Sequence, residues 1–201
     1  MATVDDGTLA LAKEAQDLLF RSARTANAFT GEPVTDDQVR AIYDLVKWGP
    51  TAMNNQPMRL VLVRSPEARE RLVAHMTDNN KAKTAAAPLT AIVAADSGFH
   101  EHFPTTFPHK PDAREAFEDH PGRPQIARFN ASIQLGYLIL GIRAAGLAAG
   151  PMAGYDADGV AREFLNDGEQ AVAVVNIGRP DPAGTFPRLP RLDYDQVVTT
   201  V

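Results

Sequence analysis

Residues 48–58 read Trp-Gly-Pro-Thr-Ala-Met-Asn-Asn-Gln-Pro-Met, and Arg-Leu-Val-Leu-Val-Arg follows at 59–64. A helical spacing of apolar residues leads into this stretch and a strand-like run leads out of it, so it is predicted to join a helix to a strand. Pro50 and Pro57 restrict the backbone at its ends. Between them lie one hydroxyl and three carboxamides, from Thr51, Asn54, Asn55 and Gln56.

A carboxamide carries two donors and an acceptor on a neutral group, which suits the edge of a planar heterocycle with alternating C=O and N–H groups. The same composition is typical of a polar surface turn punctuated by proline. Composition alone favours the surface turn, with a ligand-binding segment as the alternative.

Residues 50–57 resemble the P-[ST]-[SA]-x-N-x-Q-P segment of the nitroreductase family, whose members are FMN-dependent NAD(P)H oxidoreductases. The similarity extends from about residue 19 to residue 195. Lys-Trp-Gly-Pro at 47–50 and Arg-Leu-Pro-Arg-Leu at 188–192 are most similar to the malonic semialdehyde reductase branch. The resemblance implies that this segment contacts the flavin through Pro50, Thr51, Ala52, Asn54 and Gln56.

Length and composition limit the class of protein. A chain of 201 residues can bury a substantial core, and its formal charge of −5 argues against a nucleic-acid-binding surface. The absence of cysteine excludes disulfides, a thiolate nucleophile and a cysteine-ligated metal. Residues 1–6 lack the features of a signal peptide, and glycines and Pro151 interrupt the apolar tract 135–155, so a cytoplasmic, soluble protein is expected.

Helices are predicted at 9–23, from the capping box at 35–38 to about 48, from the Ser65-Pro66 start to about 75, at 125–145 and, more weakly, at 156–165. Val39, Ile42, Tyr43 and Val46 are expected to form the inner face of the second helix. Apolar runs predict strands at 60–63, 89–95 and 171–177.

Four of the five histidines fall within residues 97–123, where regular patterning ends except for a short helix near 113–117. Irregular segments of this length are often lids, and Phe103 and Phe107 are candidates to roof a substrate pocket. The tail, residues 186–201, is predicted to be extended at 186–192.

These elements predict one domain over residues 1–201, of the α+β or mixed α/β class. The resemblance implies an α+β nitroreductase-like fold, in which helices flank a central mixed sheet. It also implies an intertwined homodimer with two FMN sites at the subunit interface.

An FMN phosphate needs arginine or lysine, with backbone N–H groups helping. Arg24, with Thr25 and Asn27, stands at the family's N-terminal phosphate-binding region, although Ala-Arg-Thr at 23–25 replaces the usual Arg-Arg-Ser. Arg188 matches the C-terminal phosphate-binding arginine. Without the resemblance, both arginines would be assigned to solvated surface.

Asn80 and Lys83 match the family's Asn-x-x-Lys, which contacts the pyrimidine end of the flavin. Lys83 is the candidate positive charge near N1 and the C2 oxygen, where it would stabilise reduced flavin. A solvated polar surface is the alternative, and Asn79 with Lys81 is a competing register.

Residues 150–154, Gly-Pro-Met-Ala-Gly, resemble the loop that offers backbone N–H groups to flavin N5 and O4, so Pro151, Met152, Ala153 and Gly154 are assigned to the cofactor site. Glycine permits close backbone approach. Many relatives carry an acidic residue at the position of Ala153, so no side-chain role is assigned there.

No metal site is expected, because His100-Glu-His102 does not have the spacing of H-E-x-x-H. No G-x-G-x-x-G, Walker A or G-x-S-x-G motif occurs, so NADH or NADPH is expected to dock transiently on the flavin.

The resemblance therefore implies ping-pong hydride transfer through flavin N5, with malonic semialdehyde reduced to 3-hydroxypropionate and no catalytic side chain assigned. The alternatives are a broad nitro- or quinone reductase and, from another class, a non-catalytic flavin-binding or redox-sensing protein.

Overall fold

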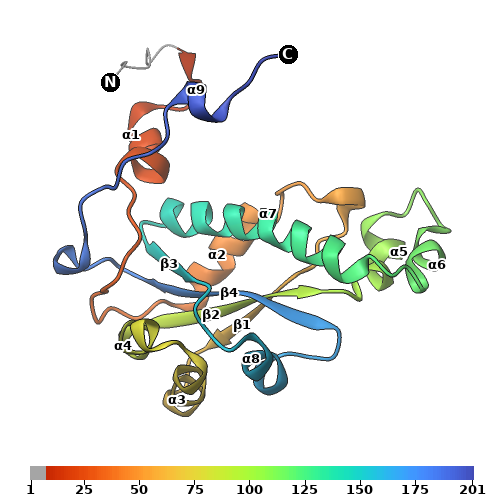
Figure 1. Ribbon diagram of the computed structural model, residues 1–201, viewed down its shortest axis with the longest axis horizontal. Coiled ribbons are helices and arrows are strands. Elements are labelled where there is room, and N and C mark those ends of the chain that lie inside the picture. Colours follow the sequence, from red (N-terminus) through yellow and green to blue (C-terminus); the bar gives the residue numbers. More distant parts are fainter. Residues whose placement is uncertain (1–7) are drawn as a thin grey trace.

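A computed structural model describes residues 8–201 (Figure 1). Its four strands are β1 (Met58–Val63), β2 (Leu89–Asp96), β3 (Ala148–Met152) and β4 (Glu169–Gly178). They form one sheet in the order β1-β2-β4-β3, and all three pairings are antiparallel. The α+β class is confirmed, whereas the expected mixed sheet is wrong for the described residues.

The helices between β1 and β2 explain that antiparallel pairing. Helix α3 (Pro66–His75) leads away from the end of β1, and α4 (Asp78–Ala86) returns beside it. Arg69, near the start of α3, donates to the carbonyl oxygen of Ala87 at the end of α4. Strand β2 therefore begins at the end of the sheet where β1 stops, and no crossover places the two strands parallel.

The remaining helices are α1, α2, α5, α6, α7, α8 and α9, at Lys13–Gln16, Asp36–Val46, Phe103–Thr106, Ala113–Glu118, Arg123–Ala144, Ala157–Phe164 and Tyr194–Val197. Single turns occur at Asp17–Arg21 (π-helical) and at Ala52–Asn54, Phe99–His102 and Pro182–Gly184 (3₁₀). No helix among residues 8–201 combines the length and apolarity needed to cross a bilayer.

Two layers of helices enclose the sheet (Figure 1). Helices α2 and α7 cover one face, where Ile42, Val46, Leu138 and Ile142 pack on the inward side chains of β2 and β4. Helices α3, α4 and α8 lie on the other face, where Leu72 and Val160 are fully buried. Burying such side chains contributes about 1.5–3 kcal/mol each.

Local signals predicted several helix starts correctly. Thr35 accepts a hydrogen bond from the Gln38 amide, and the Gln38 side chain accepts one from the Thr35 amide, which completes the capping box of α2. Ser65 caps α3 ahead of Pro66. The assignment of Tyr43 to the inner face of α2 is wrong, because its side chain is 49% exposed.

The predictions for the N-terminal part of the chain are either wrong or lie outside the described residues. The helix predicted at 9–23 is reduced to α1 and one π-helical turn, and Leu18 and Phe20 are about half exposed. Because most helical stability comes from packing, an apolar stripe with little to pack against does not sustain a long helix. The prediction that the chain lacks a signal peptide concerns residues 1–6, which lie outside the described residues.

Residues 97–123 contain more regular structure than expected. The turn at Phe99–His102 and helices α5 and α6 surround buried Phe99 and Phe103, with Phe117 edge-on to both rings. The short helix predicted near 113–117 is confirmed as α6. The tail has neither helix nor strand at 186–192 and then forms α9, whose capping box (Asp193 and Gln196) was missed.

Candidate functional site

Arg24 and Arg188, which are 164 positions apart in the sequence, meet in one pocket of about 760 Å³, hereafter the arginine pocket. The Arg188 Nη2 donates to the carbonyl oxygens of Phe20 and Ala23, at 3.3 and 3.0 Å. The Arg24 Nη1 donates to the Ala23 carbonyl at 3.0 Å. Main-chain carbonyls of one short segment therefore orient both guanidinium groups.

Two further arginines, Arg143 and Arg191, line the same pocket and were not predicted as site residues. Arg143 lies in the last turn of α7, and its Nη1 donates to the carbonyl oxygen of Leu19 at 2.8 Å. Burial, and then the charge of Arg188, lower the pKa of Arg143. Arg143 is the single charged residue within the apolar stretch 135–155, and this isolation was the sequence signal that could have identified it as a site residue.

The chemistry of this lining suits an anion. Among residues 8–201, the lining contains four guanidinium groups and no carboxylate, and these groups donate to main-chain carbonyls. Arginine recognises phosphate through its fork of donors. Thr25 also lines the pocket, and Asn27 donates to the Thr25 carbonyl at 3.4 Å.

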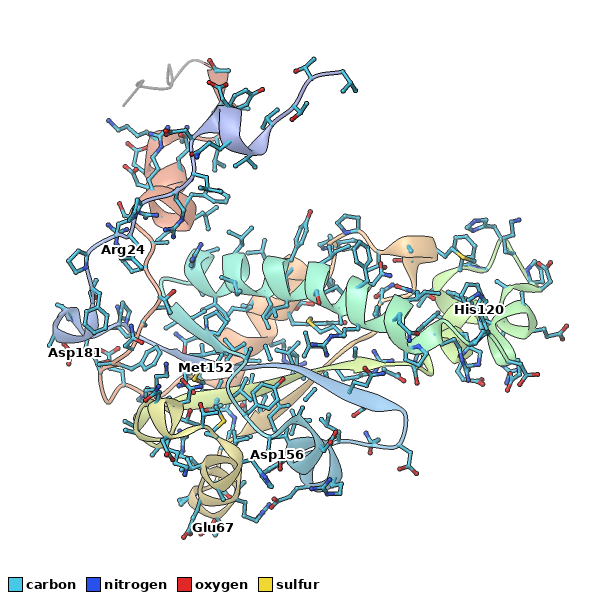
Figure 2. The ribbon with its side chains drawn as sticks, in the orientation of Figure 1. Arg24, Glu67, His120, Met152, Asp156 and Asp181 are labelled. Atoms are coloured by element: carbon cyan, nitrogen blue, oxygen red, sulfur yellow. The ribbon has the colours of Figure 1, made fainter. Side chains whose placement is uncertain are left out.

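The chain after Arg24 runs beside β3, the edge strand of the sheet (Figure 2). The Ala26 amide donates to the Ala149 carbonyl at 3.4 Å, and a Cβ built on Gly150 would lie 2.8 Å from the Ala26 carbonyl oxygen. Gly150 is therefore required for this close approach. Residues 150–154 were predicted as a loop, whereas Gly150, Pro151 and Met152 belong to β3.

Asn80 and Gly154, predicted from separate motifs, are in contact. The Asn80 Nδ2 donates to the Gly154 carbonyl at 2.9 Å, and the Thr77 hydroxyl donates to it at 3.0 Å. The two segments form one unit at the end of β3, which also includes Pro151 and Met152 of the strand and Ala153 directly after it. Lys81 pairs with Asp78 at 2.8 Å, while half-buried Lys83 lies one residue before Thr84, whose hydroxyl contacts the Met152 sulfur.

The segment of residues 50–57, hereafter the carboxamide loop, is held in an unusual backbone conformation. Met53, Asn54 and Gln56 all have positive φ, a conformation that costs about 1–3 kcal/mol at non-glycine residues. Buried Asn130 of α7 accepts the Ala52 amide at 2.8 Å, and Asn54 donates to the Thr106 carbonyl at 2.8 Å. These contacts with α7 and α5 hold the loop in that conformation.

Thr51, Asn54 and Gln56 bond mainly within the loop. The Thr51 hydroxyl accepts the Gln56 amide at 3.2 Å, and the Gln56 side chain donates to the Asn54 Oδ1 at 3.0 Å. Pro50 and Ala52 are exposed. Asn55, which was not assigned to the site, is 2% exposed, and its Oδ1 lacks a hydrogen-bond partner within the described residues.

The carboxamide loop does not meet the arginine pocket within one chain. The loop ends where the Pro57 carbonyl accepts the Asp96 amide, opposite Glu169 of β4, whereas Ala26 bonds to Ala149, opposite Ile177. These two positions of β4 are eight residues apart, which corresponds to roughly 26 Å at 3.3 Å per residue. The predicted cofactor residues therefore fall into two groups at opposite ends of the sheet.

The histidine-rich segment forms an ion-pair network. The structure gathers His100 with Glu101 and Glu118, rather than with His102, and their potential ligand atoms lie within 4.8 Å of one another. Arg114 binds Glu101 with two hydrogen bonds of 2.8 and 2.9 Å, and Arg123 approaches the His100 ring at 2.6 Å. The arginines supply the positive charge in this cluster.

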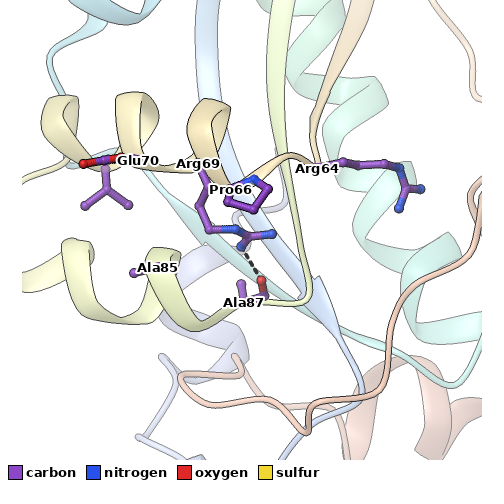
Figure 3. Close-up of a pocket in the computed structure, with 7 residues that line it drawn as sticks. Arg64, Pro66, Arg69, Glu70, Ala85 and Ala87 are labelled. Atoms are coloured by element: carbon purple, nitrogen blue, oxygen red, sulfur yellow. Dashed lines mark hydrogen bonds between the residues drawn. The ribbon is translucent and has the colours of Figure 1, made fainter.

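A groove of about 600 Å³ between α3 and α4 has a structural explanation (Figure 3). Arg69 crosses it and donates to the carbonyl oxygens of Thr84 and Pro88, at 3.2 and 3.3 Å. Thr84 lies in the last turn of α4, where carbonyls lack partners within the helix, and Pro88 lies in the segment that follows, so Arg69 satisfies the end of α4 and ties it to the start of β2. Burial lowers the pKa of Arg69.

The fold and the pockets thus define an α+β protein in which helices cover both faces of an antiparallel sheet, with an anion-type pocket beside its edge strand. The model of the nitroreductase family matches residues 20–179, and the chain belongs to this family.

Relatives and solved structures agree with this assignment. A protein of Streptomyces coelicolor, provisionally named NADH dehydrogenase/NAD(P)H nitroreductase, is 64% identical over 96% of this chain and all of its own length. A Leptothrix cholodnii protein with the same provisional name is 47% identical over 94% of this chain and 96% of its own.

A crystal structure from Exiguobacterium sibiricum, described as a provisional nitroreductase in complex with FMN, superposes with a TM-score of 0.83 at 17% identity. It covers 94% of this chain and 98% of the other. At this identity the likeness establishes the fold alone.

Proposed function

We propose that this protein is an FMN-dependent NAD(P)H oxidoreductase. The observation that carries the proposal is the convergence of Arg24 and Arg188 on one pocket that arginines line and to which no carboxylate of residues 8–201 contributes. Both residues were selected because the family binds its phosphate at these positions. Family membership and the FMN complex of the Exiguobacterium sibiricum protein support the assignment.

The side chains at the candidate site have the charges and hydrogen-bonding groups that FMN binding requires. The guanidinium groups of the arginine pocket would hold the phosphate, with Thr25 and Asn27 beside it. Lys83 would place its positive charge at the pyrimidine end of the ring, next to Asn80. When bound, FMN supplies hydride transfer between a nicotinamide and a second substrate.

The chain's own residues then have positioning roles. Asn80 and Thr77 fix the Gly154 carbonyl, and so hold residues 151–154, whose backbone N–H groups would face the ring. Asn130 fixes the carboxamide loop, which would supply Thr51, Asn54 and Gln56 to the ring edge. No side chain is assigned as acid or base, and solvent would supply the substrate proton.

We further propose a homodimer, in which each cofactor site combines the arginine pocket of one chain with the carboxamide loop of its partner. The separation of roughly 26 Å within one chain, at 3.3 Å per strand residue, supports this arrangement. So do the exposed apolar side chains on or next to α2 and α7: Leu45, Trp48, Phe129 and Tyr137.

The proposed substrate is malonic semialdehyde, reduced to 3-hydroxypropionate in the cytoplasm, with residues 97–123 as a lid and NADH or NADPH as hydride donor. A broad nitro- or quinone reductase is the second candidate, favoured by the names of the relatives. Comparing kcat/KM for malonic semialdehyde and a nitroaromatic distinguishes them.

A non-catalytic flavin-binding protein is the candidate from another class. Anaerobic addition of NADH and of NADPH to the FMN-loaded protein distinguishes it from an enzyme. We expect bleaching of the flavin absorbance with one donor or both, and an unbleached spectrum with both would contradict the oxidoreductase.

The visible spectrum and the Arg188→Ala variant test the cofactor site. We expect oxidised-flavin bands in the wild-type protein and an FMN affinity weaker by about 1.5–3 kcal/mol in the variant, the range for a hydrogen bond to a charged group. Titration of apoprotein with FMN, followed by fluorescence quenching, measures this change. A colourless protein that takes up no added FMN, or unchanged affinity in Arg188→Ala, would refute the assignment.

A further inference from the structure

The carboxamide loop has a further anchor, which comes from the first strand of the sheet. The Nη1 of Arg59, the second residue of β1, donates to the carbonyl oxygens of Gln56 and Met58, at 3.0 and 3.1 Å. Gln56 has a φ of 41°, which a non-glycine residue keeps only where its surroundings hold it. Arg59 supplies such a contact at the backbone of Gln56 itself.

Asp96, the last residue of β2, orients this arginine. Its Oδ2 lies 2.6 Å from the Arg59 Nη2, and the side chains are 29% exposed for Arg59 and 16% for Asp96. A guanidinium group is planar with its donors in a fixed fork, so a carboxylate that holds one nitrogen also sets the direction of the other. The pair therefore directs the Arg59 Nη1 at the end of the carboxamide loop.

The same carboxylate reaches the histidine-rich segment 97–123. The Oδ1 of Asp96 accepts the Gly98 amide at 2.6 Å, near the start of this segment. Further along it, the Thr106 carbonyl accepts the Asn54 side chain at 2.8 Å. Hydrogen bonds thus join the carboxamide loop to the segment at two points, and one of these connections runs through the ion pair.

Within the loop, Gln56 is bonded to the other two side chains that the proposed function places at the ring edge. Its amide donates to the Thr51 hydroxyl at 3.2 Å, and its side chain donates to the Asn54 Oδ1 at 3.0 Å. A shift of the Gln56 backbone would therefore displace all three side chains together.

We propose that Arg59 and Asp96 are positioning residues for hydride transfer. They fix the Gln56 backbone, and with it the loop that would meet the flavin, and they couple this loop to the segment 97–123. The inference rests on the proposed function, because it assigns the pair a role in that reaction. Both residues act through Gln56 rather than through contact with the cofactor.

The location of the pair predicts which step it affects. The arginine pocket lies at the opposite end of the sheet, so removal of the pair should leave the phosphate contacts in place. Hydride transfer depends instead on the relative position of donor and ring, and a displacement of about 1 Å can slow such a step about 10²-fold. Cofactor affinity and the rate of flavin reduction should therefore respond differently.

The kinetic test uses the full chain supplied with FMN and mixed anaerobically with saturating NADH or NADPH. In Arg59→Gln and in Asp96→Asn we expect flavin reduction to slow by at least about tenfold, while the Kd for FMN changes by less than about threefold. The double variant should be slower than the slower single variant by no more than about twofold, because both residues act through one contact. Unchanged reduction rates, additive losses, or a loss of FMN affinity as large as the loss of rate overturn the proposal.

Hydrogen exchange of the FMN-free protein tests the coupling without any reaction. Amides exchange faster where the local structure opens more often, so in Arg59→Gln the peptides that cover residues 51–58 and 97–106 should both exchange at least about tenfold faster. Faster exchange in residues 51–58 alone, or in neither peptide, overturns the coupling.

Two variants serve as controls. Arg64 directly follows β1 at its other end, pairs with Asp36 at 2.7 Å and donates to the Val34 carbonyl at 2.9 Å. Arg64→Gln therefore removes a comparable ion pair away from the loop and should keep the reduction rate within about twofold. Arg59→Lys keeps the charge without the fork, so it should retain the melting temperature and still slow reduction by at least about threefold. A lysine variant with the wild-type rate overturns the positioning role.

The two proposals fail differently. A protein that binds no FMN contradicts the proposed function, and the exchange comparison still decides on the coupling. A flavoprotein whose Arg59→Gln and Arg64→Gln variants are reduced at the same rate leaves the proposed function intact and overturns the positioning role.

Discussion

At the scale of single residues, the closest backbone approach in the candidate site lies at Gly150. Its ideal Cβ would fall 2.8 Å from the Ala26 carbonyl oxygen, and this neighbour is main chain that cannot rotate away. The segment that carries Arg24 therefore depends on a hydrogen at this position. A requirement of this kind is invisible in the sequence, where Gly150 is one of 14 glycines.

We predict that Gly150→Ala destabilises the protein by about 1–3 kcal/mol, the usual cost of overpacking. It should also weaken FMN binding, because the Arg24 segment must move. Gly136→Ala is the matched control: this helical glycine is exposed and has nothing within 4 Å, so alanine should stabilise α7 by up to about 1 kcal/mol. Urea unfolding measures both, and equal effects would contradict the close-approach argument.

At the scale of elements, capping chemistry decides where α2 begins. Thr35 and Gln38 satisfy each other's backbone amides, at 3.2 and 2.9 Å. Because Ile42 and Val46 of α2 pack on the sheet, an unwound start would loosen one of its covering helices.

We predict that Thr35→Ala costs about 1 kcal/mol, since alanine cannot accept the Gln38 amide. Thr35→Ser keeps the acceptor and should cost a few tenths of a kcal/mol at most, because serine ranks close to threonine as a cap. Chemical denaturation compares the two variants. A serine variant as destabilised as the alanine variant would show that the lost methyl group, rather than the cap, is responsible.

The element formed by residues 97–123 carries a buried histidine. His100 is 2% exposed, and burial, followed by the charge of Arg123, lowers its pKa. Glu101 and Glu118 act in the opposite direction, and Arg114 adds to the lowering. The folded protein therefore favours the neutral form of His100 over the protonated form.

This preference gives a pH dependence of defined sign. Between the lowered pKa and the ordinary value of 6.5, the unfolded chain binds more protons, so stability is fully present above pH 6.5 and falls as the pH drops below it. We predict that His100→Gln removes this component of the slope between about pH 5 and 7.5. Glu101 and Glu163 have lowered pKa values, so their contributions are lost only below about pH 4.5.

Urea unfolding at several pH values measures the slope. Exposed His109→Gln serves as the control and should keep the wild-type slope. An unchanged slope in His100→Gln would assign the pH dependence to other groups.

At the scale of the whole molecule, the two groups of predicted cofactor residues lie at opposite ends of one sheet. In the proposed dimer, the exposed apolar side chains of α2 and α7 would face the second chain, and stable interfaces bury about 1,200–2,000 Å² in total. The proposed dimer links this face to cofactor binding.

We predict that Phe129→Glu, which places a charge at a position 67% exposed on α7, converts a dimer to a monomer and releases FMN. Sedimentation equilibrium and flavin absorbance of the same sample report the two changes. Ala74→Glu on α3, on the opposite face of the sheet, should alter neither. A monomeric wild-type protein that binds FMN tightly would contradict the shared site.

The sequence by itself determined the local features. The capping box of α2, the Ser65-Pro66 start of α3 and the apolar runs of β2 and β4 are short-range patterns, because helix caps and strand burial depend on neighbouring residues. The residue types of the carboxamide loop and Arg24 were also found, through the resemblance to the nitroreductase family.

Only the tertiary structure decided which distant residues meet. Strand β3 was missed because Ala-Ala-Gly-Pro-Met lacks β-branched residues, and pairing with β4 rather than propensity forms it. Sheet order and helix packing bring Arg143 to Leu19 and Asn130 to Ala52, across 124 and 78 positions. Such contacts depend on how the whole chain packs, so the local spacing of residues in the sequence does not predict them.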